Sequence, residues 1–168
     1  LLHLISGLKS IQRGEVHING QDISKLGSKK LDKFRAENLG IVFQKSFFIS
    51  SLNVLENILI AGSFDSSQNS KTDRALDLLD HFNLSAKKNK SINTLSQGEQ
   101  QRVSIARPFL NHPKIVIADE PSSALDNKNC SEVIKEMFQI SEQSGTGFIV
   151  VSHDQRIHSF FDKKIALK

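Results

Sequence analysis

The sequence predicts an α/β fold with a mostly parallel sheet, and the alternation of apolar and amphipathic stretches carries that prediction. Short, wholly apolar stretches alternate with longer stretches of helical periodicity along the 168 residues. Strands that are apolar throughout are typical of a parallel sheet covered by helices, because neither face of such a strand meets water. Residues 45–95 break the alternation with helical patterns alone. We therefore expect one domain over 1–168, with a helical insertion over 45–95.

The first half of the chain contains patterns for two short strands and three helical segments. Leu1–Gly7 has the apolar pattern of the end of a helix that Gly7 stops. Residues 15–20 alternate and end in Asn-Gly, which is typical of a strand entering a tight turn. The other expected elements are a strand over 39–43 that ends at Gln44, helices over 52–60 and 72–82, and a polar loop over 62–70.

The second half returns to alternating helices and strands. A helix is expected over 98–110, with Ser96 as its N-cap and a kink at Pro108, because proline has no backbone donor. The amphipathic stretch 127–144 predicts a helix that ends near Gly145. The expected strands are 115–118, 148–151, which leads into Ser152-His153-Asp154, and an edge strand over 165–167.

Composition and charge set bounds on the class of protein. Hydrophobic residues make up 38% and charged residues 24% of the chain, as in an ordinary globular domain. The net charge of +4 permits an anionic ligand but is far from a nucleic-acid signature. No apolar run approaches the roughly 18 residues that span a bilayer. The single cysteine, Cys130, excludes an internal disulfide and fits a reducing cytosol.

Two adjacent carboxylates, Asp119 and Glu120, follow the apolar strand over 115–118. Ligands of α/β sheets bind at the carboxyl ends of the strands. Asp119 is therefore a candidate Mg²⁺ ligand, and Glu120 a candidate acceptor for a proton from an attacking water. The alternative is an acidic pair that ends a strand in solvent. The residues that follow directly, Pro121–Asp126, favour the functional interpretation.

The stretch Leu95–Arg102 is a polar turn that opens a helix. Ser96 offers a hydroxyl and Gly98 lets backbone approach a phosphate closely, at a helix end whose free N–H groups favour anions. The alternative is an ordinary serine-capped helix. Gln44 ends a strand, where its amide can meet a metal or a water, or can simply be a surface residue.

Histidine supplies one further candidate. His153 follows a buried strand and can donate a hydrogen bond to a terminal phosphate at neutral pH, although a lone histidine is more often structural. The other histidines show no metal-ligand spacing and are assigned structural roles: His3, His17, His81, His112 and His158.

Taken in order, these motifs resemble the nucleotide-binding domain of ATP-binding cassette (ABC) transporters. Gln44 matches the Q-loop, residues 95–99 the signature motif, 115–120 Walker B, 123–126 the D-loop and His153 the H-loop. Residues 99–107 and 118–121 are most similar to the branch that includes lipoprotein-releasing and macrolide-export ATPases of bacteria. The resemblance implies a P-loop NTPase-like core with an α-helical subdomain.

The sequence also departs from the family pattern. Gln97 replaces the usual first glycine of the signature motif and adds bulk near the phosphate, and Glu99 replaces the usual glutamine. Leu1 stands where the family's P-loop, Gly-x-x-x-x-Gly-Lys-Ser/Thr, would just have ended. We therefore expect the sequence to be N-terminally truncated, without the P-loop (Walker A), the first strand and the aromatic residue that stacks on adenine.

The resemblance implies a mechanism in which two copies sandwich two ATP molecules head to tail. Glu120 would polarise water and His153 would sense the γ-phosphate, which makes these two the catalytic candidates. Asp119 and Gln44 would organise Mg²⁺. The nucleotide-binding candidates are Ser96, Gln97, Gly98, Gln44 and Asp126, of which Asp126 would also link the two sites across the dimer.

The resemblance also implies partners and a location. The copies would form a homodimer or pair with another ABC ATPase subunit, and would bind transmembrane permease subunits as peripheral proteins on the cytoplasmic face of the inner (cell) membrane. Hydrolysis would drive export or lipoprotein release, and no nucleic acid is expected as a partner.

Two other functions stay open on the sequence. The chain can be a truncated or degenerate, non-catalytic module that pairs with an intact subunit; the absent P-loop favours this, whereas the presence of Asp119, Glu120 and His153 opposes it. It can also be an ABC protein that acts on ribosomes or DNA. Such proteins usually carry two cassettes or a long insertion, and the insertion over 45–95 is short.

Overall fold

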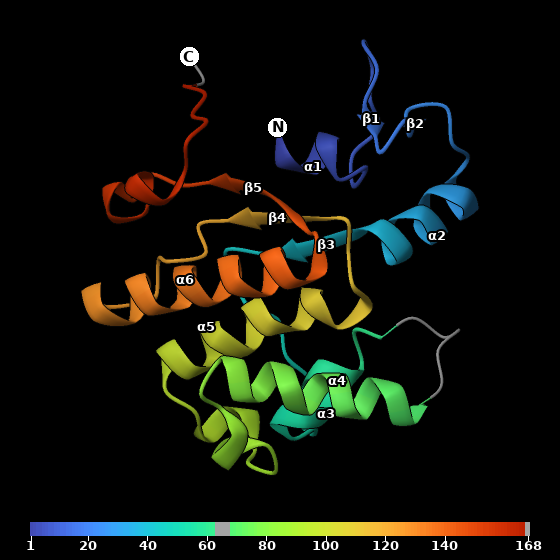
Figure 1. Cartoon of the computed structure of the whole chain (residues 1–168). Helices are drawn as coiled ribbons and strands as arrows, with labels where there is room; N and C mark the ends of the chain where they lie inside the picture. The colour runs from blue at the N-terminus through green and yellow to red at the C-terminus, as the bar shows by residue number, and fades with distance from the viewer. Residues whose placement is uncertain (63–67, 167–168) are drawn as a thin grey trace.

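A computed structural model describes residues 1–62 and 68–166, and its centre is a three-stranded parallel sheet (Figure 1). The strands lie in the order β3 (Leu39–Val42), β4 (Ile115–Asp119) and β5 (Gly147–Val151). In the register of the sheet, Ala118 pairs with Val42 on one side and with Val150 on the other. The predicted α/β fold with a parallel sheet is therefore confirmed.

Helices cover both faces of this sheet. Helices α5 (Gln97–Ala106) and α6 (Asn127–Ser144) lie below the strands in Figure 1, and the short α1 (Leu2–Ile5) lies above them. The side chains of β4 alternate accordingly. Val116 and Ala118 belong to the main core, while Ile117 lines a small cavity with residues of α1. Wholly apolar strands thus bury both faces, as the sequence pattern requires.

The N-terminal elements agree only in part with the sequence pattern. The strand predicted over 15–20 is observed as β1 (His17–Ile18), and its turn, with Asn19 and Gly20 at φ of 50° and 79°, leads into β2 (Gln21–Asp22), a strand that was not predicted. Helix α2 (Ser28–Asn38) was not predicted: none of its residues is fully buried, and only Leu31 and Phe34 pack against a small apolar cluster, which leaves a weak amphipathic pattern.

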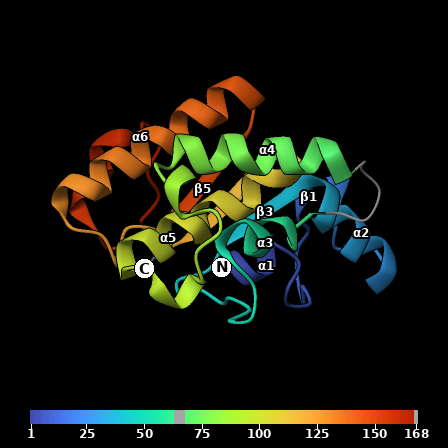
Figure 2. The same ribbon diagram turned by 90° about the horizontal axis from the view of Figure 1, so that it is seen from below.

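Helices fill the chain between β3 and β4. The helices predicted over 52–60 and 72–82 are confirmed as α3 (Val54–Leu59) and α4 (Gln68–His81), and they are followed by 3-10 turns η1 (Ser85–Lys87) and η2 (Ile92–Thr94). In Figure 2, seen from below, α4 lies in front of α5 and the sheet. We propose that 45–95 is a helical subdomain, as the insertion over these residues suggests.

Three predicted elements need correction. The polar loop over 62–70 lies outside the described residues at 63–67, and 68–70 already belong to α4. The helix over 98–110 narrows to the 3-10 helix η3 (Arg107–Asn111), because Pro108 interrupts the α-helical hydrogen bonds as expected. No strand forms at 165–166, where Ile165 is 87% exposed, and Leu167 lies outside the described residues.

The C-terminal part agrees closely with the pattern. Helix α6 spans the predicted residues and ends at Gly145 with φ of +65°, a left-handed conformation that glycine adopts readily. After β5, residues 152–154 lead into a 3-10 helix, η4 (Gln155–Phe160). The end of β4 and the end of β5 are therefore neighbours, and both carry the polar residues singled out from the sequence.

Candidate functional site

Glu120 occupies a constrained position at the end of β4. Its backbone φ is +47°, in the left-handed region that non-glycine residues adopt at a cost of about 1–3 kcal/mol. Its backbone N–H donates to the carbonyl of Val151 at 2.9 Å, which fastens the turn to the end of β5. The surrounding contacts therefore impose a conformation on Glu120 that directs its side chain across the strand ends.

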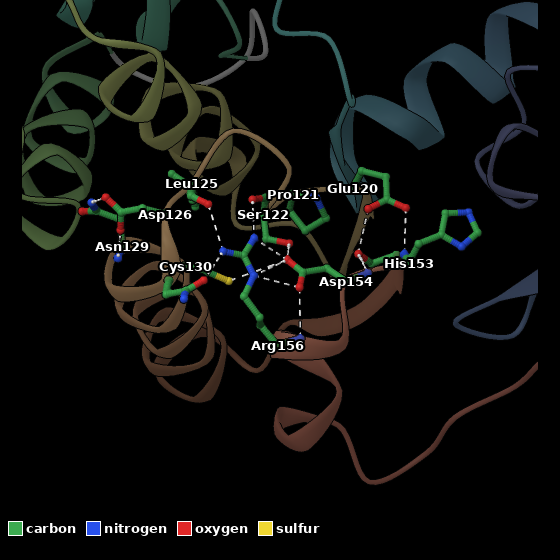
Figure 3. A network of polar contacts seen from close by, with 12 residues as sticks. Glu120, Pro121, Ser122, Leu125, Asp126, Asn129, Cys130, His153, Asp154 and Arg156 are labelled. Atoms are coloured by element: carbon green, nitrogen blue, oxygen red, sulfur yellow. Dashed lines mark hydrogen bonds and ion pairs between the residues drawn. The ribbon is translucent and has the colours of Figure 1, made fainter.

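The carboxylate of Glu120 is held by two donors from the neighbouring strand. Ser152 Oγ donates to Oε2 at 2.7 Å, and the backbone N–H of His153 donates to Oε1 at 2.9 Å (Figure 3). A carboxylate has about four acceptor positions, so acceptor capacity for a water remains. This is the geometry expected of a fixed general base.

The ring of His153 takes no part in this contact. The side chain is exposed, and the imidazole extends away from Glu120 (Figure 3). A ring in that position, beside a carboxylate that its own backbone holds, is placed to meet a ligand that approaches the strand ends. Its role in sensing a phosphate stays a prediction.

Asp119 lies on the opposite side of the turn. It is half-buried and lines a cavity of about 10 Å³ with His3 and Ser6 of the α1 region and with Phe43, one residue before Gln44. Such a volume holds about one water. The buried hydroxyl of Ser6 has no partner among the described residues, so the cavity offers a polar group for that water.

The donor chemistry at this edge fits Mg²⁺. Val42 pairs with Ala118, so the exposed Gln44 follows β3 at the same carboxyl-end edge of the sheet at which Asp119 ends β4. Carboxylate and amide oxygens are ligands that Mg²⁺ accepts. Asp119 with Gln44 therefore stays the predicted metal-binding pair.

The loop between β4 and α6 is tied to the residues after β5. Ser122 Oγ donates to Asp154 Oδ2 at 2.6 Å, and the guanidinium of Arg156 forms an ion pair with Asp154 at 2.7 Å. The hydrogen bonds from Arg156 hold the pKa of the Asp154 carboxyl well below its usual range. Neither Ser122 nor Arg156 was singled out from the sequence, because nothing in their spacing indicates that they meet.

Asp126 caps helix α6. Its Oδ1 accepts from the backbone N–H of Asn129 at 2.8 Å and its Oδ2 from the Asn129 side chain at 2.7 Å. These hydrogen bonds, the backbone one first, lower the pKa of Asp126. The Asp-x-x-Asn spacing after Leu125 is a helix-start signal that the sequence offers and that explains part of the residue's chemistry.

The start of α5 is built as a capping box. The backbone N–H of Glu99 donates to Ser96 Oγ at 3.3 Å, and the Ser96 N–H donates to Glu99 Oε2 at 2.8 Å. The bond from the Ser96 backbone, followed by the contact with Lys87, lowers the pKa of Glu99. The Ser-x-x-Glu spacing could have indicated this role for Glu99, which the sequence reading treated only as a departure.

The phosphate candidates on α5 face solvent. Ser96 and Gln97 are exposed, and a Cβ added at Gly98 would lie 3.7 Å from Leu125, an ordinary contact. Ser96 Oγ accepts a hydrogen bond from the Glu99 backbone, and its hydroxyl also hydrogen-bonds the Glu99 carboxylate, so this O–H would have to turn outward to meet a ligand. Nothing within the described chain requires glycine at 98, and a contact of Gly98 with a phosphate stays a prediction.

The described contacts divide the predicted site residues into two regions. Glu120 and His153 meet at the strand ends, whereas no described contact joins either of them to Ser96, Gln97 or Gln44. Gln101 of α5 forms an indirect link, because its Nε2 donates to the carbonyl of Pro121 at 2.9 Å. Sequence reasoning missed Gln101, whose position inside a helix gives no signal.

One group of possible metal ligands lies far from these regions, on the β1–β2 hairpin. Glu15, His17 and Asp22 place their ligand atoms within 4.8 Å of one another. The ammonium of Lys25 lies between the two carboxylates, 3.1 Å from Glu15 and 2.9 Å from Asp22, and holds the pKa of Asp22 at about 2. The structural role predicted for His17 stays a prediction, and in this group the ammonium of Lys25 already pairs with both carboxylates.

An open pocket of about 700 Å³ lies on the other side of Gln44. Residues of α2, the stretch after β3 and η3 line it, with Phe43 and Phe47 exposed by 40% and 65%. Arg107 closes its floor, donating to the Phe47 carbonyl at 2.5 Å. Exposed aromatic side chains around a hollow are typical of an interaction surface.

None of the described helices is both long and apolar enough to cross a membrane.

Comparisons with known proteins agree with one another. The sequence model of the ABC transporter family matches residues 1–123. The lipoprotein-releasing system ATP-binding protein LolD of Bacteroides fragilis is 32% identical over 98% of this chain and 77% of its own length. LolD of Buchnera aphidicola from Schizaphis graminum is 39% identical over 93% of this chain and 69% of its own length.

Solved structures give the same result. The dimeric, post-hydrolysis structure of the ATP-binding cassette MJ0796 with ADP and Pi superposes with a TM-score of 0.84 at 35% identity, covering 95% of this chain and 71% of that one. CbiO1 of Clostridium perfringens, part of the ABC transporter complex cbiONQ, gives a TM-score of 0.79 at 25% identity, covering 90% of this chain and 61% of that one.

Proposed function

This chain belongs to the ABC transporter family of ATPases, and on that premise we propose that it hydrolyses ATP to drive lipoprotein release or export through membrane subunits. The observation that carries the proposal is the carboxylate of Glu120, which Ser152 and His153 hold at 2.7 and 2.9 Å at the end of β4. A carboxylate fixed in this way, next to a second one on Asp119, is the arrangement that phosphoryl transfer to water needs.

We assign the general base to Glu120. It would accept the proton of the water that attacks the γ-phosphate, and its two hydrogen bonds keep it oriented while the proton moves. His153 would donate from its exposed ring to the γ-phosphate, and its backbone N–H couples that contact to Glu120. Asp119 and Gln44 would hold Mg²⁺, which supplies charge stabilisation to the phosphate oxygens when it is bound.

The proposal places two copies of the chain head to tail. The dimeric cassette of MJ0796 supports this pairing. Ser96, Gln97 and Gly98 of one copy would contact the γ-phosphate held by the other, through the exposed Ser96 hydroxyl and the N–H groups at the start of α5. Asp126, at the start of α6, would link the two sites across the dimer.

The pocket beside Gln44 is proposed as the docking site for a transmembrane permease subunit. Two observations support this choice: the exposed rings of Phe43 and Phe47 give an apolar rim, and the adjacent Gln44 is a predicted metal ligand. A segment that binds there would contact Phe43 and Lys45, the two chain neighbours of Gln44. The chain would then sit as a peripheral protein at the cytoplasmic face of the cell membrane, as the LolD relatives suggest.

The test is ATP hydrolysis by the protein as its gene encodes it, with any residues encoded before Leu1. We expect Mg²⁺-dependent hydrolysis, which Asp119→Asn should lower by about 10²-fold or more, since the metal supplies several kcal/mol of charge stabilisation. Asp73→Asn, on the exposed face of α4, is the matched control and should leave the rate unchanged. Absence of hydrolysis in the unaltered protein would overturn the proposal.

A further inference from the structure

The side chain of Arg156 joins separate segments of chain beside the candidate site (Figure 3). Its Nε donates to Asp154 Oδ1 at 2.9 Å and its Nη2 to Asp154 Oδ2 at 2.7 Å. Its Nη1 donates to the carbonyl of Leu125 at 3.1 Å and to Asn127 Oδ1 at 2.9 Å, and Nη2 also approaches the Ser122 carbonyl at 3.4 Å. One guanidinium therefore holds the loop between β4 and α6 against the turn after β5.

The contacts continue from Asp154 to the candidate base. The backbone N–H of Asp154 donates to Ser152 Oγ at 3.0 Å, and Ser152 Oγ donates to Glu120 at 2.7 Å. Ser122 Oγ adds a second bond to Asp154 at 2.6 Å, from the loop itself. Each step lies within hydrogen-bonding distance, so a displacement of the loop is transmitted to the Glu120 carboxylate through shared atoms.

Arginine suits this position because of its shape. A guanidinium presents five N–H donors in a planar fork, so it binds a carboxylate through two of them and backbone carbonyls through others. Lysine has a single ammonium and cannot reach Asp154 and the Leu125 carbonyl with the same geometry. The side chain of Asp154 is 14% exposed and that of Arg156 34%, so solvent screens the pair only in part.

We propose that Arg156 is a positioning residue that fixes loop 121–126, and with it Asp126, relative to Glu120 and His153. It touches none of the predicted ligand-binding groups itself and acts through Asp154 and the Leu125 carbonyl. The inference rests on the proposed function, since it assigns Arg156 to the ATPase reaction. A purely structural staple between η4 and α6 is the rival interpretation, and it predicts loss of stability without a specific loss of turnover.

The experiment compares Arg156→Ala, Arg156→Lys and the control Lys25→Ala in the protein as its gene encodes it. Lys25 also pairs with carboxylates, on the distant β1–β2 hairpin. We expect Arg156→Ala to lower kcat about tenfold with little change in KM, because the loop shifts while the phosphate contacts remain. Arg156→Lys should recover the Asp154 pair but only part of kcat, and Lys25→Ala should keep both constants.

Amide hydrogen exchange of the nucleotide-free protein supplies the second measurement. Amide exchange in the loop residues 122–126 should be faster in Arg156→Ala, while the amides of β4 keep their protection. If Arg156→Ala does not fold, the kcat and the amide exchange of Arg156→Lys test the inference instead. Unchanged kcat, or full recovery by lysine, would overturn the inference while leaving the proposed function intact. Absence of hydrolysis in the unaltered protein would overturn the proposed function first.

Discussion

The strand-end cluster and the start of α5 differ in where their polar side chains find hydrogen-bond partners. In the strand-end cluster, formed by Glu120, Ser152, Asp154 and Arg156, the polar side chains bind one another. At the start of α5, the capping box satisfies the helix N-terminus, but the exposed side of Ser96–Gly98 faces solvent. The first region is complete within one chain, and the second presents donors to something outside it.

This difference indicates what each region needs for function. A base must be oriented before the substrate arrives, so its hydrogen bonds are internal. A phosphate-binding turn must stay open, so only its own backbone is capped. On the proposed function, the two regions would be complementary halves of a site that a second copy of the chain closes.

The largest effect is expected at the centre of the strand-end cluster. Glu120→Gln keeps the size and one acceptor oxygen but removes the base, so hydrolysis should fall roughly 10³-fold. Single-turnover kinetics measure ATP hydrolysis, and light scattering in the presence of ATP measures dimerisation. Nucleotide-dependent dimerisation should persist, and an equal loss of hydrolysis and dimerisation would contradict the role of Glu120 as base.

Substitutions at two glycines, Gly98 and Gly40, distinguish an effect on ligand binding from an effect on packing. Gly98→Ala should lower hydrolysis about 10²-fold, because a methyl group holds the phosphate about 1 Å away. Its melting temperature should not fall, since the new Cβ meets only Leu125 at 3.7 Å. Gly40→Ala places a Cβ 2.7 Å from Pro108 and should cost about 1–3 kcal/mol of stability. Equal melting temperatures for the two variants would refute this contrast.

Two capping boxes allow the cap itself to be tested. Ser96→Ala should lower the free energy of unfolding by about 1 kcal/mol and hydrolysis about tenfold, since it removes both the cap and the outward donor. Asn53→Ala removes the equivalent cap of α3, where Asn53 and Glu56 form the same box. It should show the stability loss in urea unfolding and full hydrolysis. If Ser96→Ala behaves like Asn53→Ala, Ser96 has only a structural role.

The smallest expected effect is on the free energy of unfolding at acidic pH. The pKa of Asp154 is lowered from its ordinary value of 3.8, chiefly by the hydrogen bonds from Arg156. A carboxyl with a lowered folded-state pKa contributes stability that is present above its unfolded pKa and is lost as pH falls through the folded one. The free energy of unfolding should therefore decrease below about pH 4. Asp154→Asn should show a shallower decrease, and an identical slope would argue against the ion pair.

Much of the framework follows from local patterns. The apolar strand over 115–118 and the helix over 127–144 are confirmed, because period and end signals such as Gly145 are visible in the sequence. Helix α2 was not predicted because only Leu31 and Phe34 give it an apolar face, which is too little for a clear helical period. The edge strand at 165–167 was predicted from apolar character alone, which does not show whether a pairing partner is present.

The polar contacts also divide into local ones, which the sequence predicts, and long-range ones, which it does not. Ser96 as N-cap is a matter of neighbouring residues, and the structure places it so. The bond of Arg156 to the Leu125 carbonyl and that of Ser122 to Asp154 join residues that are brought together by the parallel pairing of β4 with β5, which no local spacing reveals. Candidate site residues were therefore accessible from motifs, whereas the groups that position them were accessible only from the fold.

The most direct test of the central claim is to mix two inactive variants. Glu120→Gln and Gly98→Ala are combined in equal amounts, and ATP hydrolysis is measured against each variant alone. If each site takes Glu120 from one copy and Gly98 from the other, half of the dimers are mixed and each mixed dimer has one intact site of two. Activity should then recover to about a quarter of the unaltered rate. Activity that stays at the level of the separate variants would place both regions in a site within one copy and contradict the account.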